Sequence, residues 1–209
     1  MTERWISVVA TGEASVAPDM AVVSLTVSGK GRELGPTRDD VIRRTSEVLA
    51  RLRELGVADA DLNAPDVGIH PEYDYRKTGQ KLVGYLVTRA VSARVRELDT
   101  LGAVLDGVVA AGANEVHGAQ MTASDPSSAD HEALGAAVEA ARAKAAAIAD
   151  ASGVTLGGVA RVEEDPDGGH VPMPRMHMAA MAEAGGIPTE VAAGDLTVTR
   201  RIRAWFDLA

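Results

Sequence analysis

The chain has 209 residues, enough for one large domain or two small associated ones, and its 46% hydrophobic and 24% charged residues are ordinary for a globular protein. Its 30 acidic and 21 basic residues give a formal net charge of -9, which repels phosphate backbones and argues against a nucleic-acid partner. The absence of cysteine excludes disulfides, thiolate zinc sites, iron–sulfur clusters and cysteine nucleophiles.

The first ten residues already show a polar, alternating pattern rather than the apolar core of a signal peptide. No stretch approaches the ~18 uninterrupted apolar residues that a membrane-spanning helix needs. We therefore expect a cytoplasmic protein without a membrane span, or a periplasmic or secreted one if a leader has been removed from the sequence.

The first part of the chain predicts a β-β-α unit. Alternating apolar residues predict strands over 5–16 and 20–28, which a turn at Ala17-Pro18-Asp19 would join into a hairpin. Thr37 followed by Asp40 resembles a capping box, and an apolar stripe at helical spacing then runs to Gly56. The pattern indicates a helix that begins near Thr37 and ends at that glycine.

The same order of elements repeats in the next part of the chain. Strands are predicted over 67–75 and 82–95, and a helix over about 99–111 that ends at Gly112. Two successive β-β-α units suggest an architectural duplication.

The third part of the chain is dominated by alanine. A short strand over about 116–123 precedes an Ala-rich helix that continues to about residue 151 and ends at Gly153. Alanine occupies eleven of the nineteen positions over 133–151. Because alanine favours helix but buries little area, we expect this helix to approach another surface closely.

The predicted fold class is α+β, with antiparallel β-sheet(s), helices packed on one face, two β-β-α units, the long Ala-rich helix and C-terminal strands at 156–164 and 195–207. We expect a single domain over 1–209, with 1–64 and 65–209 as an alternative division. The first and last strands should be neighbours in one sheet, because Trp5, Trp205 and Phe206 hold half of the six aromatic residues. The last strand has one apolar face, which only Arg200 interrupts.

Three glycines lie where a nucleotide-binding loop would join a strand to a helix: Gly29, Gly31 and Gly35. The third glycine of that motif should occupy position 34, which is Leu34, and the preceding strands do not resemble a parallel crossover. We therefore interpret these glycines as turn residues.

Several charged and titratable residues are candidates for a functional site. The acidic run Glu163, Glu164, Asp165 and Asp167 lacks the ligand spacing of a calcium loop, so a solvated turn, or pairing with the arginines at 200, 201 and 203, is favoured. The five histidines show no metal-ligand spacing, and no Gly-x-Ser-x-Gly motif occurs. We assign no catalytic, cofactor-binding or metal-binding residue.

A Gly- and Pro-rich segment over 165–194 carries the most specific local pattern. Such a long segment without periodicity is usually functional or flexible. Its potential soft ligands, over 170–181, are His170, Met173, Met176, His177, Met178 and Met181. Thioether and imidazole groups suit Cu(I), and exposed methionine is reversibly oxidised, but packing of methionine in a groove or between subunits is the favoured interpretation.

Ordered groups of residues along nearly the whole chain resemble one family. They are Val9-Ala-Thr-Gly12-Glu-Ala-Ser-Val-Ala17-Pro18-Asp19-Met-Ala21, then Tyr85-x-Val87 with Val91, the segment from Ala133-Leu134 to Gly153 and Leu156-Gly157, and finally Gly194-Asp-Leu196-x-Val198 with Phe206. The sequence is similar to the SIMPL domain family, also called DUF541.

The resemblance implies an α+β domain of antiparallel strands with helices on one side, often assembled into ring-like or channel-like oligomers. Family members are associated with envelope or oxidative-stress roles in bacteria, and no catalytic residues are known to carry over. We therefore expect a non-enzymatic, self-assembling protein that is linked to stress and offers a surface or lumen to partners. The alternatives are a Cu(I)-binding or redox-responsive protein acting through residues 170–181 and, ranked lowest, an enzyme whose site forms only on folding.

Overall fold

The computed structural model describes residues 4–75, 80–164, 173–174 and 194–209. Its contacts divide the chain into two compact units, each described by itself below. The first unit comprises Met1–Pro18, Ala123–Ala179 and Ala193–Ala209, and the second comprises Asp19–Thr122 and Ala180–Ala192. These boundaries differ from the alternative division near residue 64, and the single domain over 1–209 stays a prediction.

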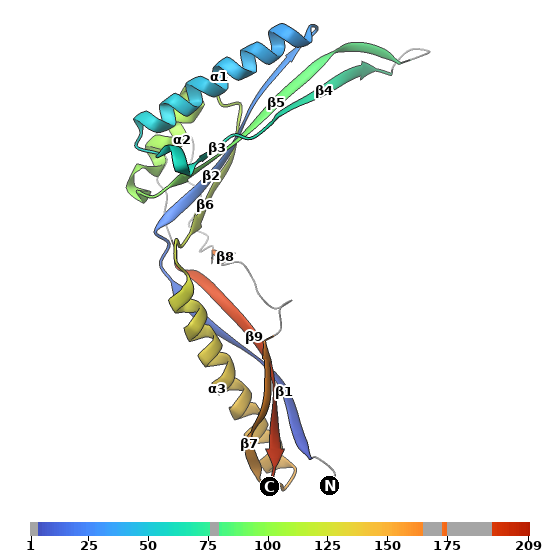
Figure 1. The fold of residues 1–209 in the computed structure, drawn as a ribbon, viewed down its shortest axis with the longest axis vertical. Helices are drawn as coiled ribbons and strands as arrows, with labels where there is room; N and C mark the ends of the chain where they lie inside the picture. Colours follow the sequence, from blue (N-terminus) through green and yellow to red (C-terminus); the bar gives the residue numbers. More distant parts are fainter. Residues whose placement is uncertain (1–3, 76–79, 165–172, 175–193) are drawn as a thin grey trace, which may run out of the picture. The chain divides into compact units, whose positions relative to one another are not determined.

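The first unit is an antiparallel sheet with one long helix beside it in the part of the chain that is described (Figure 1). Its elements in chain order are β1 (Trp5–Val16), α3 (Ser127–Ala151), β7 (Leu156–Glu164), β8 (Met173–Pro174) and β9 (Leu196–Leu208). The strand order is β1-β9-β7, and β8 also pairs with β9. β1 pairs with β9 along its whole length, from Trp5 opposite Asp207 to Val16 opposite Leu196, so the predicted pairing of the first and last strands is confirmed.

The Ala-rich helix α3 packs on this sheet through a single stripe of small residues. The buried alanines recur at every fourth position, and they are Ala129, Ala133, Ala137, Ala141, Ala145 and Ala149. The third to fifth of these alanines share a core with Val8, Ile202 and Phe206, and the first two share another with Ala14 and Val198. A side chain at Gly12 of β1 would overlap the main chain of α3 at Ala133, which shows how closely the helix approaches the strand. The close approach expected from the alanine content is therefore confirmed.

The second unit is an antiparallel sheet whose one face is covered by two helices. Its elements in chain order are β2 (Met20–Gly31), α1 (Leu34–Glu54), the 3₁₀ turn η1 (Asp59–Asp61), β3 (Leu62–Asn63), β4 (Val67–Asp74), β5 (Lys81–Val95), the 3₁₀ turn η2 (Leu98–Thr100), α2 (Leu101–Ala110) and β6 (Glu115–Thr122). The strand order is β3-β5-β2-β6, and β4 pairs with the first half of β5 (Figure 1). Alternate residues of β2 and β5, among them Val23, Leu25 and Val91, are buried in the core of this unit.

The predicted hairpin of the first two strands is wrong. β1 pairs with β9 in the sheet of the first unit, whereas β2 pairs with β5 on one edge and with β6 on the other. A strand has only two hydrogen-bonding edges, so β2 has no edge left for β1. The turn signal at Ala17-Pro18-Asp19 therefore marks the passage of the chain from one unit to the other.

The interpretation of Gly29 and Gly31 as turn residues is also wrong. β2 continues through both glycines, and α1 begins at Leu34 rather than near Thr37. A side chain at Gly31 would overlap the Thr37 hydroxyl group, so this glycine permits the close approach of the helix. The Thr37 hydroxyl donates to the carbonyl oxygen of Glu33, 2.7 Å away, so it does not cap the helix as the predicted capping box required.

The ends of the three helices agree with the sequence patterns. Gly56, Gly112 and Gly153 follow α1, α2 and α3, and their φ angles are 90°, 107° and 68°. Residues with a side chain rarely adopt such left-handed conformations, and glycine is the usual residue after a helix.

Candidate functional site

The Met/His segment over 170–181 lies outside the described residues, apart from Met173 and Pro174, which form β8 and pair with Thr197 and Leu196. The hypothesis that this segment binds Cu(I) or responds to oxidation therefore stays a prediction. Within the ranges that the structure describes, no group of three or more histidine, aspartate and glutamate side chains is close enough to hold a metal ion.

The first two residues of the acidic run face arginines on the neighbouring strand, as one of the two interpretations predicted. Glu163 of β7 is opposite Arg203 of β9, and an Oε1 atom of Glu164 lies 3.9 Å from Nε of Arg200. Asp165 and Asp167 lie outside the described residues.

Three of the five histidines lie in the described residues, each on a different element. His70 is exposed on β4 and His131 is exposed on α3. His117 of β6 is hydrogen-bonded through Nε2 to the Thr26 hydroxyl group of β2, 2.9 Å away, so it serves a cross-strand contact within the sheet.

A buried carboxylate lies in the 3₁₀ turn η1 of the second unit. Asp61 of η1 accepts hydrogen bonds from Nε and Nη2 of Arg96 at 2.7 and 2.8 Å, and a small pocket of about 140 Å³ lies next to the pair. The Asp61 side chain is 6% exposed, whereas that of Arg96 is 60% exposed. The hydrogen bonds from Arg96 hold the pKa of Asp61 below its usual value. Because each side chain of this pair neutralises the charge of the other, we interpret the pair as a link between η1 and the end of β5.

One candidate surface is an apolar arm formed by the ends of β4 and β5, over residues 69–75 and 81–85. The ladder between β2 and β5 ends with Gly31 opposite Tyr85, so residues 81–84 of β5 pair only with β4 in the described part of the chain. The two strands run side by side to the segment that joins them (Figure 1). We refer to this feature as the β4–β5 arm.

The β4–β5 arm exposes large apolar side chains on a face that is covered elsewhere in the sheet. Ile69 lies opposite Val87, whose side chain is in the core, and Tyr73 lies opposite Leu82 after a register shift. The exposed fractions are 42% for Ile69, 39% for Tyr73, 72% for Tyr75, 44% for Leu82 and 46% for Val83. The rings of Tyr73 and Tyr75 lie 6.4 Å apart between centroids. The arm therefore continues the apolar face of the sheet without its helix cover.

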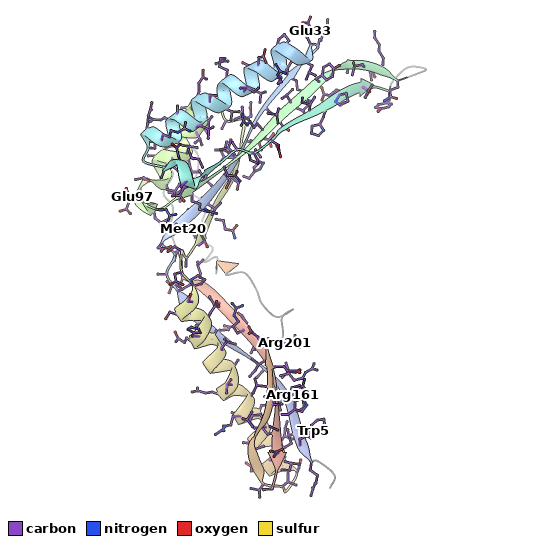
Figure 2. All side chains as sticks on the ribbon, in the orientation of Figure 1. Trp5, Met20, Glu33, Glu97, Arg161 and Arg201 are labelled. Carbon is purple, nitrogen blue, oxygen red and sulfur yellow. The ribbon has the colours of Figure 1, made fainter. Side chains whose placement is uncertain are left out.

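The other candidate surface is a pocket on the first unit, on the sheet face that α3 does not cover. Trp5 of β1 lies opposite Asp207, and Trp205 of β9 lies opposite both Ser7 of β1 and Arg161 of β7. The guanidinium carbon of Arg161 lies 5.1 Å from the centroid of the Trp205 ring. Figure 2 shows Trp5 and Arg161 at the same end of this sheet. The pocket has a volume of about 540 Å³ and is lined by Arg4, Trp5, Ala160, Arg161, Trp205, Asp207 and Leu208. We call it the tryptophan pocket.

The three large rings at the ends of these strands differ in burial, because Phe206 lies in the core and Trp205 is half-buried on the opposite face of the sheet. Phe206 is 1% exposed, whereas Trp5 is 52% exposed. The alternation of β9 contains the relevant signal, because it places Trp205 on the same face as Arg201 and Arg203.

Comparison with known protein families finds one that matches almost the whole chain. The family model described as SIMPL, protein of unknown function (DUF541), matches residues 6–206. No helix within the described ranges combines the length and apolar character that a membrane span requires.

The chain is similar to proteins of several bacteria. It is 32% identical over 122 residues to the uncharacterized protein YggE of Edwardsiella ictaluri, a match that covers 57% of this chain and 51% of that protein. Identity to YggE of Escherichia coli strain K12 is 28% over 134 residues, covering 63% of this chain and 54% of that protein. Identity to the 26 kDa periplasmic immunogenic protein of Brucella melitensis biotype 1 is 30% over 145 residues, covering 66% and 58%.

The chain spans about half the length of the curated relatives it matches. The family model, in contrast, extends from the second residue of β1 to Phe206 of β9 and so includes both units. The chain therefore belongs to the SIMPL family, whose function is unknown.

Proposed function

We propose that this protein is a non-enzymatic, self-assembling member of the SIMPL family whose assembled form offers a surface or lumen to partners. The observation that carries the proposal is the β4–β5 arm, which exposes five large apolar side chains on two paired strands. Single exposed apolar side chains are normal on a monomer, but a contiguous cluster marks an interaction surface.

A second copy of the same arm is the partner that fits this surface. Two arms related by a two-fold axis would bring Tyr73, Tyr75 and Leu82 of one copy against the same residues of the other. Tyrosine is enriched in interfaces because its ring is apolar and its hydroxyl group can form hydrogen bonds with water. Burial of apolar area contributes about 25 cal/mol per Å², so a contact of this kind can offset the repulsion between two chains of net charge -9.

The charges near the arm do not oppose such a contact. Lys30 of β2 donates to Oε1 of Glu72 of β4 at 2.6 Å, so these two charges neutralise each other beside the apolar residues. Among the described residues, β4 pairs only with β5, along one of its two hydrogen-bonding edges. The N–H and C=O groups of its other edge are therefore open to pairing with another chain.

The proposal that the protein is not an enzyme comes from the family resemblance. Within the described ranges, Asp61 and Arg96 form an ion pair with each other. The described histidines lie on separate elements. The name of the Brucella relative favours a periplasmic location for this chain as well, in place of the cytoplasmic location expected from the sequence. A role in stress stays a prediction from the family resemblance.

Light scattering coupled to size-exclusion chromatography tests the assembly. We expect the wild type to elute as an oligomer, and a variant with Tyr75→Ser, Leu82→Ser and Val83→Ser to elute near the monomer mass of 21.7 kDa with an unchanged circular dichroism spectrum. The matched control carries Val138→Ser and Ile148→Ser on α3, two residues that are each 40% exposed, and should remain an oligomer. A wild-type monomer at micromolar concentration, or an arm variant that keeps the wild-type mass, would refute the proposal.

The Met/His segment provides a second candidate function, which rests on its sequence pattern alone. If it binds Cu(I), the wild type should compete with a Cu(I) chelator, and a variant with Met173→Leu, Met176→Leu and Met178→Leu should compete less well. Equal competition by the two proteins would leave packing as the role of these methionines.

A further inference from the structure

We propose that the tryptophan pocket of the first unit binds small aromatic monocarboxylates. This proposal concerns a different unit from the β4–β5 arm and does not depend on self-assembly. It rests on the placement of two indole rings and one stacked guanidinium group around a single pocket.

The tryptophans are held on the open face of the sheet by the register of the strands. Ile6 lies opposite Phe206 and Val8 lies opposite Ala204, and these four side chains face α3. Side chains alternate along a strand, so Trp5 and Trp205 must face away from the helix. The two rings are diagonal neighbours on adjacent antiparallel strands, where side chains lie roughly 7–8 Å apart and aromatic rings are within reach of each other.

The position of Trp5 is not explained by the stability of the unit. Phe206 supplies the large aromatic residue of the core, whereas Trp5 keeps 52% of its surface exposed. An exposed indole ring beside a pocket offers a flat surface on which a planar ligand can stack. The pocket volume of about 540 Å³ lies in the range of about 300–1,000 Å³ that is typical of small-molecule sites.

Arg161 gives the pocket its preference for an anion. Its guanidinium group is positioned by the Trp205 ring at 5.1 Å and by an ion pair with Glu163. A guanidinium group positioned in this way can still donate to a carboxylate, and its planar shape fits the two carboxylate oxygens. The charge of the ligand is therefore specified by a side chain that is already oriented before binding.

The other charged residues of the lining favour a single negative charge on the ligand. Arg4 and Arg161 supply two guanidinium groups, and Asp207 supplies one carboxylate. These three lining residues carry a formal charge of +1, and Glu163, which pairs with Arg161, lies outside the lining. A monocarboxylate complements this excess, whereas a second negative charge would face Asp207.

The experiment uses naphthalene-2-carboxylate as the probe and its neutral amide, 2-naphthamide, for comparison. The chain contains only two tryptophans, and both line this pocket, so the two indole N–H signals in an ¹⁵N–¹H NMR spectrum report on this site alone. We expect both signals to shift in a saturable way with the carboxylate, and the amide to bind at least 10-fold more weakly.

Two arginine variants separate recognition of the carboxylate from nonspecific attraction. Arg161→Gln should weaken binding of the carboxylate about 10-fold and leave binding of the amide unchanged. Arg201→Gln is the matched control. It removes an equal charge from the neighbouring strand β9, on the same face of the sheet, but Arg201 does not line the pocket, so the affinity should change less than 2-fold. If Arg161→Gln alters the circular dichroism spectrum, Arg161→Lys replaces it, and weaker binding of the carboxylate is again expected because the planar group is lost.

Three results would overturn the proposal. The first is that neither indole signal shifts with the carboxylate up to about 10 mM, a concentration at which even millimolar affinity is visible. The second is equal affinity for the carboxylate and the amide, which would indicate stacking without recognition of charge. The third is an equal loss of affinity in Arg161→Gln and Arg201→Gln, which would indicate a diffuse attraction of anions.

Discussion

Arg200 of β9 reaches from the apolar face of its strand to α3, where its Nη2 atom donates to Oδ1 of Asp130 at 2.6 Å. The two side chains are 22% and 28% exposed, so the pair lies at the margin of the core rather than within it. Arg200 is opposite Gly12 on β1. The one polar interruption predicted in the last strand is therefore accommodated by an ion pair with the covering helix.

The Arg200–Asp130 pair should contribute modestly to stability. In a double-mutant cycle with Arg200→Met and Asp130→Asn, we expect a coupling energy of about 1 kcal/mol, because both groups keep contact with water. Urea unfolding at pH 7 measures it. A coupling energy near zero would show that the attraction between the two charges is cancelled by the loss of their solvation.

The close contact between β1 and α3 should make Gly12 intolerant of any side chain. Gly12→Ala places a methyl group against the main chain of Ala133 and Ala137, and main-chain atoms cannot move aside cheaply. We expect a loss of at least about 1–3 kcal/mol in the free energy of unfolding. The control is Gly135→Ala on the exposed side of α3, where the new methyl group meets no atom within 4 Å and should stabilise the helix by roughly 0.5–1 kcal/mol. Equal effects in the two variants would contradict the packing described here.

The alanine stripe of α3 should resist enlargement in the same way. Ala141→Leu inserts a larger side chain between the helix and the sheet and should lower the thermal midpoint, with a loss of about 1–3 kcal/mol. Ala143→Leu, on the exposed side of the same helix, should change stability by less than about 0.5 kcal/mol. Differential scanning calorimetry compares the two, and a tolerated Ala141→Leu would mean that the helix can move away from the sheet.

The Asp61–Arg96 pair predicts a specific pH dependence. The pKa of Asp61 in the folded protein lies below its unfolded value, so ionisation of this carboxyl group stabilises the fold above the unfolded pKa, near 3.9. That stabilisation is lost as the pH falls through the lower, folded pKa. We expect Asp61→Asn to lower the urea midpoint at pH 7 and to differ progressively less from the wild type below about pH 4. A difference of constant size from pH 7 to pH 2 would exclude the ionised carboxylate as its cause.

Removal of residues 200–209 should unfold the first unit rather than shorten a tail. β9 lies between β1 and β7 and carries Ile202, Ala204 and Phe206 into the core, so both ladders lose their shared strand. Circular dichroism should show a loss of strand signal and a lower thermal midpoint. A truncated protein with the wild-type spectrum and midpoint would show that β9 is peripheral.

The elements of this fold were predictable from the sequence because their signals are local. The alternation over 5–16 predicted the bounds of β1, that over 20–28 predicted most of β2, and glycines after each helix predicted the helix ends. The partners of the strands depend on residues far away in sequence. The hairpin prediction was wrong because it considered only the nearest strand, whereas β9 matches β1 over its whole length and buries its apolar face on the same helix.

The candidate surfaces were less predictable, for two physical reasons. The tryptophan pocket requires Arg161 to lie opposite Trp205, and this register follows two irregularities in the pairing of β7 with β9 that no sequence pattern indicates. The arm resembles an ordinary half-buried hairpin in sequence, and its exposure arises because β4 and β5 continue past the end of β2. Tyr73 and Leu82 are therefore exposed because β2 ends before β4 and β5 do. The sequence pattern of β4 and β5 themselves does not indicate this exposure.

The pairing of β1 with β9 also constrains the order in which the protein can fold during synthesis. A ribosome makes the chain from residue 1 onward, so β1 emerges roughly 180 residues before its partner. The second unit's described strands and helices, all within Asp19–Thr122, are complete much earlier and can fold while the rest of the chain is still being made. Until β9 arrives, the apolar residues of β1 have no sheet to join. The first unit can therefore complete its sheet only after almost all of the described chain has been made.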